Sequence, residues 1–219
     1  MKEVLNIGID IGSTTVKMVV MDKKENVLYE AYERHFSDTK KTIISLFKDV
    51  LKKFNNNSFT IILTGSGAIS IAKYLGVNFI QEVIACKNAI EKYAPSTDVA
   101  IELGGEDAKI IYFDQTIEQR MNGSCAGGTG AFLDQMAVLL NTTTEGLNEL
   151  AKGGTTIYPI ASRCGVFAKT DVQPLLNEGA KKEDVAVSIM QAVVNQTISG
   201  LACGKPIRGN VIFLGGPLN

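Results

Sequence analysis

The sequence predicts an α/β protein with two lobes, and three observations favour this class. Short apolar strands alternate with amphipathic helical stretches along the chain of 219 residues. Two strand-rich blocks, near residues 4–33 and 99–121, each open with an apolar strand that runs into a polar glycine turn. No low-complexity stretch or long linker separates them, and Pro95 ends a helical stretch between them. We therefore expect a first lobe over residues 1–95 and a second over 96–219.

The first lobe is expected to open with three strands joined by short turns, over residues 4–10, 15–21 and 26–33. Apolar residues then recur at helical spacing, which predicts a helix over 39–53. A fourth strand over 59–63 stops at a Thr-Gly-Ser-Gly turn, and two helices are expected to follow over 68–75 and 81–93.

The second lobe begins with the same order of elements. Strands are expected over 99–103, 108–113 and 116–121. A loop rich in glycine and serine over 122–130 leads into a helix over about 129–140. Further elements are helices over 142–152, 166–176 and 182–201, and a last strand over 211–214.

Charge and hydropathy exclude several classes of function. The chain has 22 Lys and Arg against 23 Asp and Glu, so no basic field is available for nucleic acid. No apolar run approaches the ~20 residues that span a bilayer, so we expect no membrane association. The first residues lead straight into a strand and not into a signal peptide, which predicts a cytoplasmic protein.

The first glycine turn has the composition of a phosphate-binding turn. Its residues, Asp10-Ile11-Gly12-Ser13-Thr14-Thr15, end one strand and start the next. Glycine lets the backbone approach a ligand closely, and turn N–H groups and hydroxyls donate to phosphate oxygens. Asp10 could hold Mg²⁺ through water, and Lys17 adds a cation. A plain hairpin turn capped by Ser and Thr is the alternative.

A second turn, Glu102-Leu103-Gly104-Gly105-Glu106-Asp107, again places a carboxylate at a strand end before glycines, and Gly215-Gly216 closes the final strand. This order resembles the actin/Hsp70/sugar-kinase superfamily, with its two-lobed, RNase H-like fold. There, two hairpins hold the phosphates and a late Gly-Gly turn lies against adenosine. The resemblance implies ATP binding. Neither a helix-opening Gly-x-Gly-x-x-Gly nor a P-loop occurs.

Two of the four cysteines, Cys125 and Cys164, lie in loops directly before predicted helices. Helix N-termini present N–H groups and a partial positive charge, which favour a thiolate and suit an anionic metal–thiolate cluster. Two cysteines cannot complete a four-thiolate site, so a symmetric dimer would supply the other two. Two inert thiols, or a zinc site completed by distant residues, are the alternatives.

The other cysteines and the single histidine receive plainer interpretations. Cys86 falls on an apolar helical stripe and is expected in the core. Cys203 lies near the end of the long predicted helix without a partner at ligand spacing, and we interpret it as structural. His35 follows a charged strand end, so we expect it to be exposed to solvent.

With both turns and both cysteines considered, the chain resembles the activator components of 2-hydroxyacyl-CoA dehydratases, grouped with the ATPase subunits of benzoyl-CoA reductases (BadF/BadG/BcrA/BcrD type). The matching stretches are GIDIGSTTVK (8–17), ELGGEDAK (102–109), MNGSCAGGTGAFLDQMA (121–137), SRCGVFAKTDV (162–172) and FLGG (213–216).

The resemblance implies a homodimeric, actin-like ATPase with one [4Fe–4S] cluster held between subunits by two cysteines from each, here Cys125 and Cys164. It implies that reduced ferredoxin or flavodoxin supplies one electron. ATP binding and hydrolysis would then drive that electron at low potential into a partner, a 2-hydroxyacyl-CoA dehydratase or a related reductase.

The resemblance also implies the site residues. The carboxylates with catalytic roles are Asp10, near Mg²⁺, and Glu102 and Asp107. The ATP-binding residues are Gly12, Ser13, Thr14, Thr15, Val16, Lys17, Gly104, Gly105, Gly215 and Gly216. Glu102 stands where the family usually has Asp. The chain ends at Asn219, where the family continues, so we expect an incomplete adenosine side in the second lobe.

Two other hypotheses come from different classes. A sugar-type kinase of the same superfamily would need an aspartate base beside a substrate hydroxyl, for which Asp134 and Asp171 are candidates, with the cysteines incidental. A non-catalytic module would bind nucleotide and a partner but no metal. Iron content after anaerobic purification distinguishes the activator from both.

Overall fold

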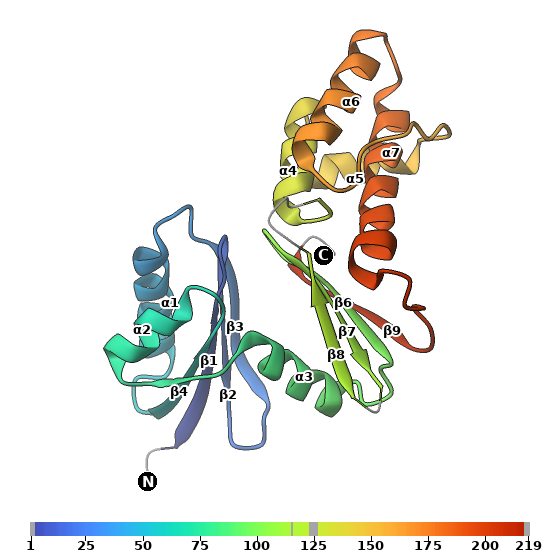
Figure 1. Ribbon diagram of the computed structural model, residues 1–219. Coiled ribbons are helices and arrows are strands. Elements are labelled where there is room, and N and C mark those ends of the chain that lie inside the picture. Colours follow the sequence, from blue (N-terminus) through green and yellow to red (C-terminus); the bar gives the residue numbers. More distant parts are fainter. Residues whose placement is uncertain (1–2, 115, 123–126, 217–219) are drawn as a thin grey trace. The chain divides into compact units, whose positions relative to one another are not determined.

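The computed structural model describes residues 3–114, 116–122 and 127–216. The chain divides into two compact units, Met1–Pro95 and Ser96–Asn219 (Figure 1). Each unit has its own sheet and its own hydrophobic core.

The first unit is a five-stranded sheet with the order β3-β2-β1-β4-β5. The strands are β1 (Val4–Ile11), β2 (Thr15–Met21), β3 (Val27–Arg34), β4 (Ser58–Thr64) and β5 (Asn78–Phe79). The first three form an antiparallel meander, and β4 joins β1 in parallel. The hairpin turn after β1 therefore lies at the same sheet end as the end of β4.

Three helices belong to this unit: α1 (Thr39–Lys53), α2 (Ala68–Leu75) and α3 (Glu82–Tyr93). The Asp38 side chain starts α1 by accepting from the backbone N–H of Lys41. Helices α1 and α2 lie beside the sheet (Figure 1). Their buried residues form one core with the alternate apolar residues of β1.

The second unit is a four-stranded sheet with the order β8-β7-β6-β9. The strands are β6 (Val99–Leu103), β7 (Ala108–Phe113), β8 (Ile117–Met121) and β9 (Val211–Leu214), and β9 joins β6 in parallel. The helices are α4 (Gly130–Leu139), α5 (Thr144–Lys152), α6 (Gly165–Asn177), α7 (Lys182–Asn195) and the π-helix η1 (Gln196–Ala202). Both units thus place an antiparallel hairpin on one side of their first strand and a parallel strand on the other.

The long helix expected over 182–201 is not α-helical throughout. After Asn195 it continues as the π-helix η1. The Thr197 hydroxyl donates to the carbonyl of Val193, and the Ser199 hydroxyl donates to the carbonyl of Asn195. Such side-chain bonds compete with the regular backbone ladder and favour a wider turn. The spacing of apolar residues in the sequence does not reveal this competition.

In the described part of the chain, Lys182–Ala202 is long and apolar enough to cross a membrane by length and composition alone, contrary to the expectation of no such stretch. Within the molecule, 56% of its apolar window is buried. Val185 and Ile189 are fully buried in the core of the second unit. We therefore interpret the segment as a core helix.

Candidate functional site

The turn between β1 and β2 places an ion pair at the end of the first sheet. The Gly12 N–H donates to the Thr15 carbonyl at 2.9 Å, which closes the turn. Asp10 and Lys17 are opposite residues on the two strands, and Lys17 Nζ lies 2.7 Å from Asp10 Oδ2. The other carboxylate oxygen, Oδ1, is buried and accepts no hydrogen bond from the described residues. The carboxylate therefore keeps an acceptor position for a cation or its water.

The parallel strand β4 ends beside the same carboxylate. Thr64 is the register partner of Asp10, and its buried hydroxyl likewise has no hydrogen-bond partner in the described part of the chain. The next residue, Gly65, has a φ of +96°, and a Cβ there would collide with the Asp10 carboxylate. Position 65 therefore needs glycine both for its backbone conformation and because there is no room for a side chain. Two strands thus bring oxygen groups with unused hydrogen-bonding capacity to one point.

The other predicted residues of this turn divide between the loop and the core. Ser13 and Thr14 form the loop between β1 and β2. Val16 lies on β2 with its side chain fully buried in the core of the first unit. Only its backbone is therefore available for the binding role that the sequence predicts.

His35 is buried against the turn, so the expectation of an exposed histidine is wrong. It is 8% exposed. Its backbone N–H donates to the Thr14 carbonyl at 3.1 Å, and its Nε2 lies 3.3 Å from the Gly12 carbonyl oxygen. The reason is topological: β3 pairs with β2 up to Arg34, so the hairpin carries the next residue to the turn. Local charge along the chain does not reveal that neighbour.

The second turn has the same plan with a buried cation. The Gly104 N–H donates to the Asp107 carbonyl at 2.8 Å. Glu102 and Lys109 are opposite residues of β6 and β7, at the same spacing as Asp10 and Lys17 in the first turn. Lys109 Nζ lies 3.1 Å from Asp107 Oδ2 and 3.7 Å from Glu102 Oε1, and Lys109 is 5% exposed. One ammonium group therefore serves both predicted carboxylates.

Helix α4 supports the backbone of the second turn. The N–H of Gly130 donates to the Gly104 carbonyl at 2.9 Å, and the N–H of Ala131 donates to the Gly105 carbonyl at 2.8 Å. These are N–H groups of the first helical turn, which have no partner within their own helix. The orientation of the glycine turn is therefore fixed by backbone contacts.

The late Gly-Gly turn lies at the same sheet end. Gly215 has a φ of +112°, and a Cβ there would collide with the Leu103 carbonyl at the end of β6. Gly216 follows directly, and Leu214 is the register partner of Glu102. The structure thus brings together the second-lobe residues that the sequence separates by more than a hundred positions.

The structure describes only one of the two cysteines predicted to hold the cluster. Cys164 is the N-cap residue of α6, whereas Cys125 lies outside the described residues. Gly127 packs against the backbone of Ser162 and Arg163, so closely that a Cβ there would collide with the Ser162 carbonyl. The chain two residues after Cys125 therefore lies against the residues that directly precede Cys164.

The helices after both cysteines touch near their starts. The Cβ position of Gly165, in α6, lies 3.3 Å from Gln135 Oε1 and 3.6 Å from the Phe132 ring, both in α4. Val166 and Phe167, which follow, are 70% and 65% exposed. An apolar surface therefore borders Cys164.

The remaining cysteines differ from each other. Cys86 is partly buried, and Cys203 is exposed, with its thiol donating to the Gly200 carbonyl at 3.1 Å. Cys203 is the C-cap residue of η1 and has a left-handed backbone conformation, and its interpretation as a structural side chain stays a prediction. Among the described residues, a set from which Cys125 is missing, no three His, Cys, Asp or Glu side chains form a metal site.

The sheet order and the two carboxylate–glycine turns define an actin-like and sugar-kinase-like α/β fold, which confirms the predicted fold class; sugar kinases share it at low identity. The chain belongs to the BadF/BadG/BcrA/BcrD ATPase family, which it matches over residues 7–219.

Relatives and solved structures agree with this membership. The (R)-2-hydroxyglutaryl-CoA dehydratase activating ATPase of Acidaminococcus fermentans is 31% identical over 97% of this chain and 83% of that protein. Component A of the dehydratase from that organism has a TM-score of 0.86 at 28% identity, covering 97% and 83% of the two chains. The Clostridium difficile 2-hydroxyisocaproyl-CoA dehydratase activator with bound ADPNP has a TM-score of 0.84 at 27% identity, covering 97% and 80%.

Sequence reasoning missed three residues of these turns. Lys109 was detectable, because it follows Glu102 at the spacing that links Lys17 to Asp10. Gly65 was signalled by the glycine turn after the fourth strand, but not its contact with Asp10. For His35 no local signal exists, since its role depends on the pairing of β3 with β2.

Proposed function

We propose that the chain is an ATP-dependent activator that transfers single electrons through a [4Fe–4S] cluster to a 2-hydroxyacyl-CoA dehydratase or a related reductase. Family membership supports ATP hydrolysis, and the names of the relatives support the dehydratase as partner. A reduced ferredoxin or flavodoxin in the cytoplasm is the proposed electron donor.

Both glycine turns are proposed to bind the phosphates of ATP. In the first, Ser13 to Lys17 supply turn N–H groups, hydroxyls and an ammonium group; in the second, Gly104 and Gly105 supply backbone. Gly215 and Gly216 are proposed to border adenosine. The ADPNP bound to the Clostridium difficile relative supports a nucleotide in this fold.

Magnesium fits the end of the first sheet. Asp10 Oδ1 is a buried carboxylate oxygen without a hydrogen bond from the described residues, and Mg²⁺ prefers oxygen ligands and retained waters. We assign Asp10 to this ion, directly or through water. Glu102 and Asp107 share Lys109, so we propose that they act on the nucleotide from the second turn while that ammonium limits their negative charge.

The single observation that carries the electron-transfer proposal is the packing of Gly127 against Ser162 and Arg163. It supports a common site for the loops of Cys125 and Cys164 at the starts of α4 and α6. Thiolates at helix N-termini suit a cluster, and the cluster supplies one-electron chemistry. The protein's part is to hold the thiolates and to control their exposure to water.

A second copy of the chain is the proposed source of the remaining two thiolates. Exposed apolar side chains that form a patch mark an interaction surface, and Val166 and Phe167 directly follow Cys164. A homodimer across this surface would cover both side chains and complete a four-cysteine site.

Iron content tests the proposal. The wild-type protein, reconstituted without oxygen, should hold about four irons per two chains. Cys164→Ser and Cys125→Ser should abolish this content, whereas Cys203→Ser, an exposed cysteine outside the site, should keep it. A colourless wild-type protein, or full iron in the Cys164 variant, would contradict the electron-transfer proposal.

An iron-free ATP-binding protein would leave the kinase and the nucleotide-gated module as explanations. Of the two aspartates considered for a kinase base, Asp171 already accepts the Ala161 N–H at 2.8 Å, just before the Cys164 loop. That contact gives Asp171 a structural role, which is a further reason to prefer the activator.

A further inference from the structure

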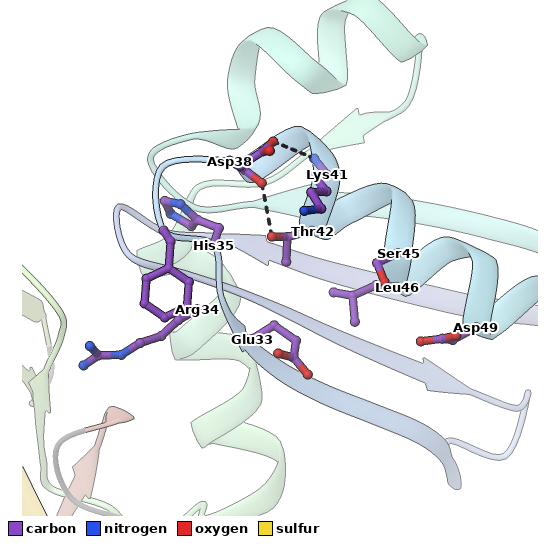
Figure 2. A pocket seen from close by; sticks show the side chains of 10 residues that line it. Glu33, Arg34, His35, Asp38, Lys41, Thr42, Ser45, Leu46 and Asp49 are labelled. Atoms are coloured by element: carbon purple, nitrogen blue, oxygen red, sulfur yellow. Dashed lines mark hydrogen bonds between the residues drawn. The ribbon is translucent and has the colours of Figure 1, made fainter.

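We infer that His35 is a positioning residue for the phosphate turn, holding the Gly12 carbonyl so that the next N–H faces the nucleotide. This inference rests on the proposed ATP site. His35 lies at the end of β3, where it also lines a shallow depression of about 390 Å³ beside α1 (Figure 2). It touches no phosphate and acts through the backbone of the turn.

The contacts of the ring select one tautomer. Nδ1 lies 3.1 Å from the Ser37 N–H, and a backbone N–H can only donate, so Nδ1 carries no proton. Nε2 lies 3.3 Å from the Gly12 carbonyl, which can only accept, so Nε2 carries the proton. The ring is therefore neutral, and it connects two backbone groups through opposite nitrogens.

The geometry of the peptide bond relates the contact of the Gly12 carbonyl to the direction of the Ser13 N–H. In a trans peptide, the carbonyl of one residue and the N–H of the next point to opposite sides. Because the Gly12 carbonyl points to His35, the Ser13 N–H points away from it. The backbone N–H of His35 adds a second hold on the Thr14 carbonyl. A single residue thus fixes two carbonyls of the turn and leaves the face with the Ser13 N–H for an anion.

The segment after His35 is built to hold the ring. Phe36 and Ser37 have φ values of +45° and +65°, a left-handed conformation that is unfavourable in residues other than glycine. The turn closes where the Asp38 N–H donates to the His35 carbonyl at 2.7 Å, and Asp38 then caps α1. The strained pair places the Ser37 N–H against Nδ1.

The test uses two substitutions that each keep one half of the ring's contacts. His35→Gln places an amide N–H near the position of Nε2 and keeps the bond to Gly12. His35→Asn places a carbonyl oxygen near Nδ1, keeps the bond to Ser37 and loses Gly12. Ser45→Ala, in the same depression but without contact with the turn, is the control. All are measured in the full chain for affinity toward Mg²⁺ with ADPNP and for thermal stability.

We expect His35→Asn to bind the nucleotide about five- to tenfold more weakly, the effect of one lost hydrogen bond. His35→Gln should stay within about twofold of the wild type, as should the Ser45 control. Wild-type-like binding by His35→Asn, or equal losses in both variants that follow their melting temperatures, would overturn the inference alone. If the wild-type chain binds no nucleotide, the proposed function fails and the inference fails with it.

Nitrogen-15 NMR of the imidazole tests the two ring contacts independently of nucleotide affinity. The expected signature is a protonated Nε2 and an unprotonated Nδ1 in the wild-type protein. A ring protonated on Nδ1 would overturn the inference, whatever the nucleotide affinity.

Discussion

The two glycine turns share one plan but are supported differently. In each, a carboxylate at a strand end faces a lysine on the returning strand, and a glycine N–H closes the turn. In the first turn, His35 holds two backbone carbonyls. In the second, the N–H groups of Gly130 and Ala131 at the start of α4 hold the carbonyls. A side chain therefore contributes to the support of the first turn, together with the backbone N–H groups of His35 and Gly67, whereas the carbonyls of Gly104 and Gly105 in the second turn are held by a helix start.

The lysines of the two turns differ in their exposure to solvent. The side chains of Lys17 and Asp10 are 36% and 21% exposed, so water and ligands reach the pair. Lys109 is 5% exposed and lies between two carboxylates. The comparison indicates that the ammonium group of the first turn is accessible to solvent, whereas the ammonium group of the second turn is buried.

The largest expected effect comes from the glycines that end the parallel strands. Gly65 and Gly215 both have left-handed φ values, and a Cβ on either would collide with backbone at the neighbouring turn. Gly215→Ala and Gly65→Ala should each lower the free energy of unfolding by about 2–5 kcal/mol, from backbone conformation and overpacking together. Urea denaturation measures this loss.

The matched control is Gly8→Ala in β1. No atom lies within 4 Å of a Cβ at this position, so stability should stay near that of the wild type. The comparison also predicts a difference between the two glycines. Only Gly65 contacts the predicted Mg²⁺ ligand, Asp10, so only Gly65→Ala should weaken the Mg²⁺ dependence of nucleotide binding in its folded fraction, whereas Gly215→Ala should weaken binding with and without Mg²⁺. An equal Mg²⁺ dependence in both variants would contradict this distinction.

The sequence was sufficient for all strands except the short β5 and for which residues form each turn, because both depend on local patterns. Alternation of apolar residues located the strands, and glycine beside a carboxylate located the turns. It was insufficient where the contact is made between distant segments. The collision at Gly65 depends on the parallel pairing of β4 with β1, and the burial of His35 depends on the pairing of β3 with β2. The residues that make these two contacts do not by themselves reveal how the strands pair.

The next largest effect is a difference in stability between the variants of the two lysines, Lys109 and Lys17. Lys109→Met removes the ammonium group that lies near both Glu102 and Asp107, and should lower the free energy of unfolding by about 2–3 kcal/mol, less than for a fully buried pair because Asp107 is 43% exposed. Lys17→Met removes a partly exposed pair and should lower it by less than about 1 kcal/mol.

Nucleotide binding should respond in the opposite order. Lys17→Met removes a proposed phosphate contact, so affinity for ADPNP with Mg²⁺ should fall at least about tenfold, as for a lost hydrogen bond to a charged group. Lys109→Met should weaken binding less than Lys17→Met, because Lys109 is buried and contacts the carboxylates of the second turn, while Lys17 is the proposed phosphate contact. Calorimetric titration and denaturation of the same preparations measure both. A stability loss from Lys17→Met as large as that from Lys109→Met would contradict the assignment of the first turn to function.

The smallest expected effect concerns Asp184, whose side chain holds two backbone N–H groups in the second unit. The buried Asp184 carboxylate accepts from the backbone N–H groups of Thr155 and Thr156 at 2.8 and 2.9 Å. These bonds, Thr155 first, hold the pKa of Asp184 below its ordinary value of 3.8. The stabilisation is therefore complete above that value and is lost as the pH falls through the lower pKa of the folded state. Asp184→Asn keeps an acceptor oxygen but not the charge.

The variant should thus be modestly less stable than the wild type at about pH 7, and the difference should narrow as the pH falls below 3.8, the ordinary value for an aspartate. Denaturant midpoints across this range measure it, and Asp49→Asn, on α1 of the first unit, is a control for general charge effects. A difference that stays constant down to the lowest pH would mean that Asp184 acts only as a neutral acceptor. In that case both units would have backbone held by a side chain that needs no charge, His35 at the first turn and Asp184 at Thr155 and Thr156.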